Sequence, residues 1–181
     1  MRIFLGIPIE PEIRGEITKI QKQIDFEGIK LVEPENLHWT VKFFGELSNN
    51  ELDEVKKKMD NINKNAFEIE IGGLGVFPSI SYIKTIWIDC LKGKSEFKSL
   101  LEETNKTFSK IGKKDRKEKI PHLTIGRVKF TKNKEKLKKI IENNKNIVIG
   151  KSLVNKMHLY ESILSTSGPK YRVLKEVVLN E

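Results

Sequence analysis

The chain has 181 residues, 38% hydrophobic and 33% charged, which is typical of one soluble domain or of two fused lobes. No apolar run approaches the roughly 20 residues of a membrane-spanning helix, so we expect no membrane association. The single cysteine, Cys90, excludes a disulfide framework and a cysteine-based zinc site, and it fits a cytoplasmic location. The net charge of +9 favours polyanionic partners such as nucleic acid, although surfaces rich in lysine and glutamate also mark thermophilic proteins.

The first half of the chain predicts alternating strands and helices. Residues 2–8 are rich in β-formers and end at Pro8, and Pro11 then opens a helix with isoleucines at helical spacing up to Ile24. Ser48, with Glu51 three residues later, has the pattern of a capping box. We expect strands at 2–8, 36–44, 66–76 and 83–91, helices at 11–24 and 48–61, and an irregular segment around 28–34.

The second half predicts the same kinds of element. Residues 95–111 carry the apolar stripe of a helix, and a basic loop at 112–117 follows it. We expect strands at 120–130, 146–162 (bent near Gly150) and 170–179, and a helix at 134–143. This order indicates an α+β fold over residues 1–181, with two similar lobes. Each lobe should have a mainly antiparallel sheet with helices on its outer face.

Two of the predicted strands share the pattern His, apolar, Thr, apolar. His38 and Thr40 form one copy, and His122 and Thr124 form the other 84 residues later, close to half the chain. Alternate side chains of a strand face opposite sides, so each histidine shares a face with its threonine. The residues on the opposite face are expected in the core: Trp39, Val41, Leu123 and Ile125. If the lobes are related by an approximate two-fold axis, the two histidine strands line a central cleft.

Two histidines facing one cleft are suited to in-line phosphodiester chemistry. One imidazole removes a proton from the nucleophile and the other donates one to the leaving oxygen. Threonine hydroxyls donate hydrogen bonds to the non-bridging phosphate oxygens, and nearby cations stabilise developing charge. Neither motif has carboxylate or cysteine partners at metal-ligand spacing, so we predict a site without metal or cofactor.

Four further residues are candidates for substrate binding. Lys42 and Phe44 share strand parity with His38, so an unbroken strand would direct both towards the cleft. Arg127 has the opposite parity to His122, but a β-bulge at Gly126, or a position at the end of the strand, would bring its side chain back to the cleft. Tyr171 lies beside a Ser/Gly-rich loop and is a candidate for stacking on an RNA base.

The motifs resemble those of the two-histidine phosphoesterase superfamily, specifically its RNA 2′,3′-cyclic phosphodiesterase branch, also called 2′-5′ RNA ligases. The resemblance covers nearly the whole chain in order. It includes the first strand, both signatures and the closing hairpin, at residues 2–8, 35–46, 77–79, 120–128, 159–162 and 168–171.

This resemblance implies metal-independent hydrolysis of RNA 2′,3′-cyclic phosphate ends to 2′-phosphates, with reversible 2′-5′ ligation as a further activity. It implies that His38 is the proton donor and His122 the acceptor; residue chemistry alone leaves that assignment open. The expected partner is RNA with a cyclic phosphate end, including tRNA fragments, bound by a monomer. The alternatives are a non-catalytic RNA- or nucleotide-binding module, or a phosphodiesterase acting on small cyclic nucleotides or 2′-5′ oligonucleotides.

Overall fold

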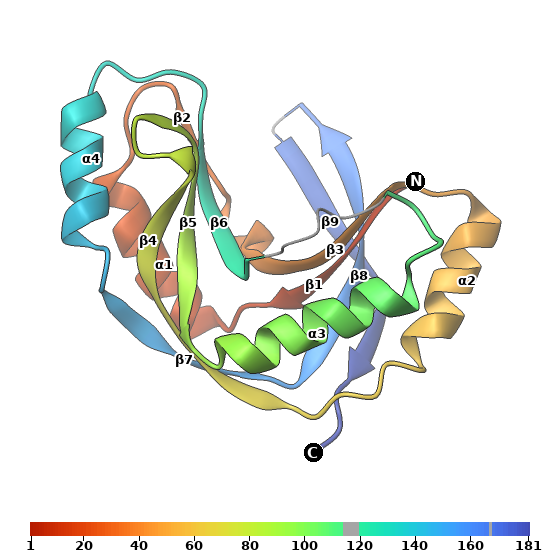
Figure 1. The fold of residues 1–181 in the computed structure, drawn as a ribbon. Coiled ribbons are helices and arrows are strands. Elements are labelled where there is room, and N and C mark those ends of the chain that lie inside the picture. The colour runs from red at the N-terminus through yellow and green to blue at the C-terminus, as the bar shows by residue number, and fades with distance from the viewer. Residues whose placement is uncertain (114–119, 167) are drawn as a thin grey trace.

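The computed structural model describes residues 1–113, 120–166 and 168–181 (Figure 1). Part of the predicted basic loop at 112–117 therefore lies outside the described residues. The first half contains β1 (Arg2–Pro8), α1 (Pro11–Gln23), β2 (Ile29–Leu31), a 3-10 helix (Pro34–Asn36), β3 (His38–Glu46), α2 (Asn49–Met59), β4 (Phe67–Ser79) and β5 (Tyr82–Lys92). The second half contains α3 (Lys94–Thr107), β6 (His122–Val128), α4 (Lys134–Asn143), β7 (Val148–Val154), β8 (Lys156–Ser165) and β9 (Gly168–Val178).

Most predicted elements are confirmed, including the capping box of α2, in which Ser48 and Glu51 bond reciprocally. Two predictions differ from the structure. The segment around 28–34, expected to be irregular, includes β2 and the start of the 3-10 helix. Residues 146–162, expected to hold one bent strand, hold two strands that meet at Asn155 and belong to different sheets. Strand periodicity cannot reveal such a crossing, because both strands have the same alternation.

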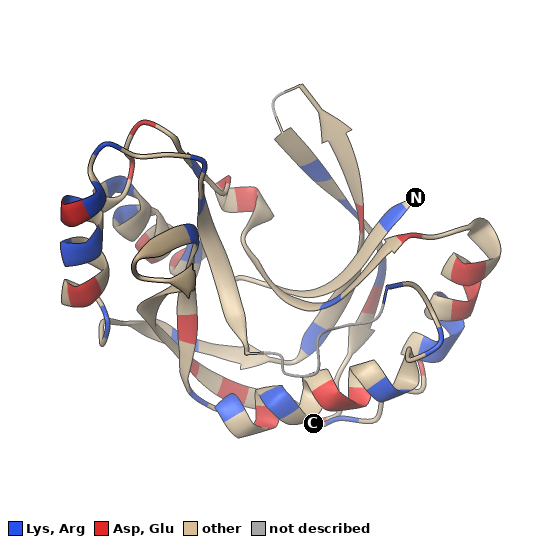
Figure 2. Ribbon diagram, turned by 45° about the horizontal axis from the view of Figure 1, so that its top comes forward, with Lys and Arg blue, Asp and Glu red and all other residues tan. Residues whose placement is uncertain are grey.

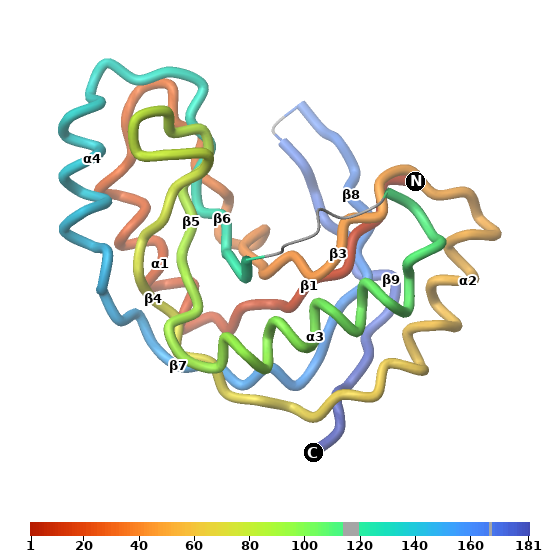
Figure 3. Tube along the Cα trace, in the orientation of Figure 1, coloured from red at the N-terminus to blue at the C-terminus, as the bar shows by residue number. Residues whose placement is uncertain are grey.

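The described strands form two antiparallel sheets, with the orders β3-β1-β8-β9 and β2-β6-β5-β4-β7. The predicted α+β class and the two lobes are thus confirmed. Each sheet combines strands from both halves of the chain, as the colours of Figure 3 show. The order β1-α1-β3-α2 recurs as β5-α3-β6-α4 when β2 is set aside, and β3 lies beside β1 as β6 lies beside β5. The two histidine strands therefore occupy equivalent places.

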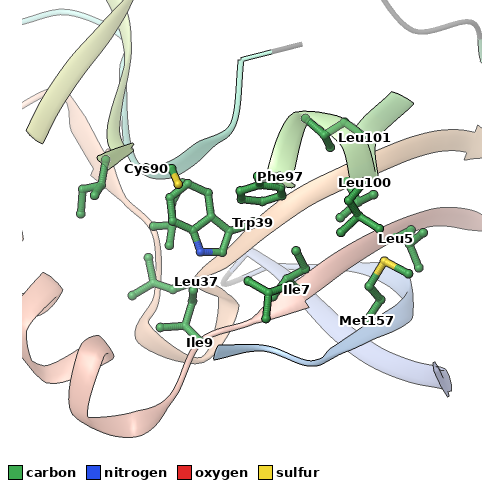
Figure 4. Packing of buried hydrophobic residues seen from close by; sticks show 14 of the residues in the cluster. Leu5, Ile7, Ile9, Leu37, Trp39, Cys90, Phe97, Leu100, Leu101 and Met157 are labelled. Atoms are coloured by element: carbon green, nitrogen blue, oxygen red, sulfur yellow. The ribbon is translucent and has the colours of Figure 1, made fainter. Parts of the chain in front are cut away.

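The core lies behind the two histidine strands. Trp39 of β3 is 1% exposed, and its ring packs edge to face on Phe97 of α3 at 5.3 Å (Figure 4). Leu123 and Ile125 of β6 are also buried, and α1 packs against that strand. Burial of these side chains stabilises the fold by roughly 1.5–3 kcal/mol each. It also fixes which face of each strand remains for the cleft.

Candidate active site

His38 lies at the start of β3, just after the 3-10 helix. Its Nδ1 is 2.7 Å from the backbone oxygen of Asn36. Because a carbonyl only accepts, Nδ1 carries the proton of the neutral ring, and Nε2 accepts from the Thr40 hydroxyl at 3.0 Å. Gly6 on β1 leaves room for the ring, since a Cβ there would lie 3.2 Å from His38 Cδ2. The reactive nitrogen of His38 is therefore Nε2.

His122 has the same local geometry on β6. Its Nδ1 is 2.7 Å from the backbone oxygen of Ile120, again two residues upstream. The ring packs edge to face on Phe77 at 5.1 Å, with Trp87 at 6.1 Å. The two histidines are thus oriented alike, because the backbone oxygen two residues upstream holds Nδ1 of each ring.

The two strands meet at a cleft of about 870 Å³. Residues of β3 and β6 both line it, including His38, Thr40, Thr124 and Arg127. Tyr171 of β9 closes one side, and its ring stands edge to face on His38 at 5.3 Å. The structure thus brings five of the predicted site residues to one cleft; His122 is not among the described lining residues, but its charge acts on His38.

β-Bulges reverse the alternation of both histidine strands just after the threonine. On β6 the pairing with β5 skips Ile125, so Arg127 lies on the same face as His122 and Thr124, and Arg127 and Thr124 line the cleft. The bulge was predicted one residue later, at Gly126. On β3 the pairing with β1 skips Val41, and Lys42 pairs with the core residue Leu5.

The bulge on β3 contradicts the predicted positions of Lys42 and Phe44. Lys42 is 2% exposed, and its Nζ lies 3.5 Å from the backbone oxygen of Lys113. Phe44 is fully buried and packs edge to face on Phe108 at 5.2 Å. Neither side chain lines the cleft. Unbroken alternation was the wrong assumption, because one extra residue exchanges the two faces of a strand.

Phe43 takes the cleft position that was assigned to its neighbours. It follows Thr40 as Arg127 follows Thr124, so the two residues are equivalent in the repeat. Superposing the two His-x-Thr motifs at their 84-residue separation would have paired them. Sequence reasoning also missed the role of Phe4, whose ring lies 4.7 Å from that of His38.

The cleft is electropositive. Its described lining contains Arg2, Lys30, Arg127 and Lys170 against Glu33 and Glu35, and Figure 2 shows basic residues at the start of β1 and on β9. Burial lowers the pKa of His38 from 6.5 to about 4; the Asn36 carbonyl opposes this shift, whereas the charges of Arg127 and His122 add to it. His38 is therefore neutral in the free protein at pH 7, in a site suited to an anion.

The residues that the structure describes hold no group of three or more His, Cys, Asp and Glu that could bind a metal ion. No helix among them is long and apolar enough to cross a membrane.

The chain matches the sequence model of one protein family. The model of the family described as LigT like Phosphoesterase matches residues 7–87 and 91–171, and each segment contains one His-x-Thr strand. The chain belongs to the LigT-like phosphoesterase family. The two segments begin 84 residues apart, the separation of His38 and His122. The family pattern thus occurs once in each half of this phosphoesterase.

Curated relatives of this LigT-like phosphoesterase carry the name RNA 2′,3′-cyclic phosphodiesterase. The protein from Methanocaldococcus jannaschii is 42% identical over 176 residues, which cover 97% of this chain and 99% of that protein. The protein from Methanothermobacter thermautotrophicus is 34% identical over 180 residues, covering 94% and 95%. The protein from Aquifex aeolicus is 32% identical over 184 residues, covering 99% and 97%.

Solved structures show the same LigT-like fold. A protein of Thermus thermophilus superposes with a TM-score of 0.82 at 24% identity, covering 98% of this chain and 97% of that one. LigT of Escherichia coli in its apo form gives 0.78 at 20% identity, covering 99% and 98%. These likenesses cover nearly the whole of this chain and therefore both of its sheets.

Proposed function

We propose that this phosphoesterase hydrolyses RNA 2′,3′-cyclic phosphate ends to 2′-phosphates without a metal ion. One observation carries the proposal: two imidazoles on equivalent strands each have Nδ1 bonded to a backbone carbonyl, His38 lines a basic cleft, and His122 lies close enough for its charge to lower the pKa of His38. General acid–base catalysis of phosphodiester cleavage needs such a pair. The names of the relatives support the choice of RNA 2′,3′-cyclic phosphate as substrate.

In the proposed mechanism, Nε2 of His122 takes a proton from water as the water oxygen attacks phosphorus. The bond from phosphorus to the 3′ oxygen breaks, and Nε2–H of His38 protonates that oxygen. The product is a 3′ hydroxyl and a 2′-phosphate. Thr40 and Thr124 donate hydrogen bonds to the non-bridging oxygens, and Arg127 stabilises the negative charge.

Because the pKa of His38 is low in the free protein, this residue must gain a proton before it can act as the general acid. Substrate binding promotes that protonation. With a pKa of about 4, its Nε2 is unprotonated at neutral pH and accepts from Thr40. A bound phosphodiester brings a negative charge next to this nitrogen, which favours the imidazolium and raises the pKa. The substrate thereby promotes protonation of the group that donates to its own leaving oxygen.

The substrate-binding set consists of Arg127, Tyr171 and, as the structure adds, Phe43. Tyr171 and Phe43 offer rings on which an RNA base stacks. Because both histidines come from one chain, we propose that the protein acts as a monomer. Its RNA substrates include tRNA fragments, and the reduced, buried Cys90 supports a cytoplasmic location. A 5′ hydroxyl in place of water would give reversible 2′-5′ ligation at the same site.

The decisive experiment incubates the protein with an oligonucleotide that ends in a 2′,3′-cyclic phosphate, in EDTA. We expect a 2′-phosphate product, and a loss of about 10²–10⁴-fold in turnover for His38→Ala and for His122→Ala. His158→Ala is the matched control, because that imidazole bonds Glu176 away from the cleft lining. Binding without turnover would favour the non-catalytic module, and loss of activity in EDTA would overturn the metal-free mechanism.

The acid assignment has its own test. A cyclic phosphorothiolate with sulfur at the bridging 3′ position has a thiolate leaving group, which needs no proton because its pKa is near 8.5, as for a cysteine thiol. We expect this substrate to restore turnover in His38→Ala but not in His122→Ala. If turnover is restored in His122→Ala alone, His122 is the proton donor and His38 the proton acceptor.

A further inference from the structure

A second hollow adjoins the cleft at the far end of β3. It has a volume of about 400 Å³ and shares Arg2 and Phe43 with the cleft. Its other described lining residues are Phe44, Gly45, Glu46, Gly112 and Lys113. Phe43 lies three residues beyond Thr40, roughly 10 Å along the strand. The hollow is thus a continuation of the cleft away from His38.

Two cations meet at the aromatic ring that joins the cleft to the hollow. The guanidinium carbon of Arg2 lies 5.2 Å from the centre of the Phe43 ring, and Lys113 Nζ lies 5.8 Å from it. Glu46, the acidic residue of the described lining, is 3.3 Å from the N-terminal ammonium. Both cations lie over the ring of Phe43, so the hollow offers two positive charges to a phosphate of single-stranded nucleic acid.

The fold holds Lys113 in this position. Its backbone N–H donates to the Phe44 carbonyl at 2.9 Å, and its own carbonyl lies 3.5 Å from the buried Nζ of Lys42. The side-chain stem of Lys113 crosses Gly45, where an added Cβ would approach it to 3.2 Å. Figure 1 shows the chain after α3 returning to the start of β1. Lys42, predicted to touch substrate, instead supports the loop that carries Lys113.

We propose that this hollow, which we call the upstream subsite (Arg2, Phe43, Lys113), binds the phosphodiester that precedes the cyclic end of the RNA. The inference rests on the proposed function and specifies its substrate. A mononucleoside cyclic phosphate fills the catalytic cleft only, whereas a dinucleotide with a cyclic end also places its internal phosphate between Arg2 and Lys113. The enzyme therefore prefers RNA chains over cyclic mononucleotides.

The test compares kcat/KM for a mononucleoside 2′,3′-cyclic phosphate with kcat/KM for the dinucleotide that ends in the same cyclic nucleotide. For the unaltered protein we expect a ratio of about 10 or more in favour of the dinucleotide, with a steeper salt dependence for the dinucleotide. Lys113→Ala should bring this ratio to within about twofold of one. Lys57→Ala, which removes an exposed lysine of α2 with the same change in net charge, should leave the ratio unchanged.

Equal kcat/KM values for the two substrates in the unaltered protein would overturn the upstream subsite while the proposed hydrolysis stands. The same holds if Lys113→Ala keeps the full ratio. No turnover of either substrate would instead remove the proposed function. Lys42→Met provides a second variant: it keeps the buried chain but removes the ammonium that faces the Lys113 carbonyl, and it should also lower the ratio.

Discussion

Gln21 of α1 donates hydrogen bonds from Nε2 to the backbone oxygens of Ile125, at 2.9 Å, and of Val32, at 2.8 Å. The Gln21 side chain is 3% exposed. Ile125 is the residue that the pairing of β6 with β5 skips, so Gln21 satisfies a carbonyl of the bulge that turns Arg127 into the cleft. A helix near the start of the chain thus positions a residue of the second histidine strand.

Replacing Gln21 by alanine should destabilise the protein and impair substrate binding. The Val32 carbonyl loses this donor, and the Ile125 carbonyl keeps only the Val32 N–H at 3.0 Å, which together cost about 1–3 kcal/mol in the free energy of unfolding, measured by urea denaturation. Because the bulge orients Arg127, KM should also rise. Gln23→Ala, on the same helix but exposed, is the control and should change stability by no more than about 0.5 kcal/mol. An unchanged KM in Gln21→Ala would show that the bulge persists without this side chain.

Arg127→Ala should change both binding and the acidity of His38. Loss of a guanidinium from the phosphate site should raise KM about tenfold or more. The charge of Arg127 lowers the pKa of His38, so its removal should raise that pKa above about 4, which NMR titration of the His38 ring would measure. Arg172→Ala, which breaks an exposed ion pair with Glu161, should leave this pKa unchanged. A constant pKa in Arg127→Ala would contradict the electrostatic contact.

Phe43 and Phe44 are neighbours whose substitution should affect different properties: activity for Phe43 and stability for Phe44. Phe44→Ala removes a fully buried ring and should lower the free energy of unfolding by about 3–5 kcal/mol. Phe43→Ala should cost less than about 1 kcal/mol but reduce kcat/KM on RNA, because this ring lines the cleft. Urea denaturation and steady-state kinetics on both variants would measure these effects. Comparable losses of stability in the two variants would contradict the bulge.

The pKa of His38 predicts how stability depends on pH. The unfolded chain binds a proton at His38 below about pH 6.5, whereas the folded protein binds it only below about 4. The stabilisation from this residue is therefore complete above pH 6.5 and is lost as pH falls to 4. It amounts to about 3 kcal/mol in the free energy of unfolding.

Urea denaturation at pH 7 and pH 4.5 would measure this loss, and His38→Gln, which removes the titrating group, should show a smaller change between the two pH values. If the protein and the variant lose equal stability, other groups cause the pH dependence.

Local residue patterns predicted most of the helices and strands and the face that the residues of each His-x-Thr motif share. Ser48 and Glu51 specify a helix start through local hydrogen bonds, and the isoleucines of α1 specify its buried face. His38 and Thr40 share a face because they are two residues apart on a regular strand, and the same holds for His122 and Thr124. Such local rules also placed Trp39 in the core.

The positions after each threonine could not be predicted in the same way. Lys42 and Phe44 were assigned to the cleft and lie elsewhere, because the bulge at Val41 depends on pairing with β1, more than 30 residues away in sequence. The assignment of β7 and β8 to different sheets likewise depends on distant strands, because β7 pairs with β4 and β8 pairs with β1.

The sequence by itself therefore determined the fold class and the paired His-x-Thr strands, since these follow from local spacing, and it predicted the acid–base chemistry that we propose for them. Only the tertiary structure decided that Arg127 and Phe43 face the cleft, that Lys42 supports the Lys113 loop and that His38 is neutral when free. The register between distant strands and the burial of a side chain depend on partners far away in the sequence.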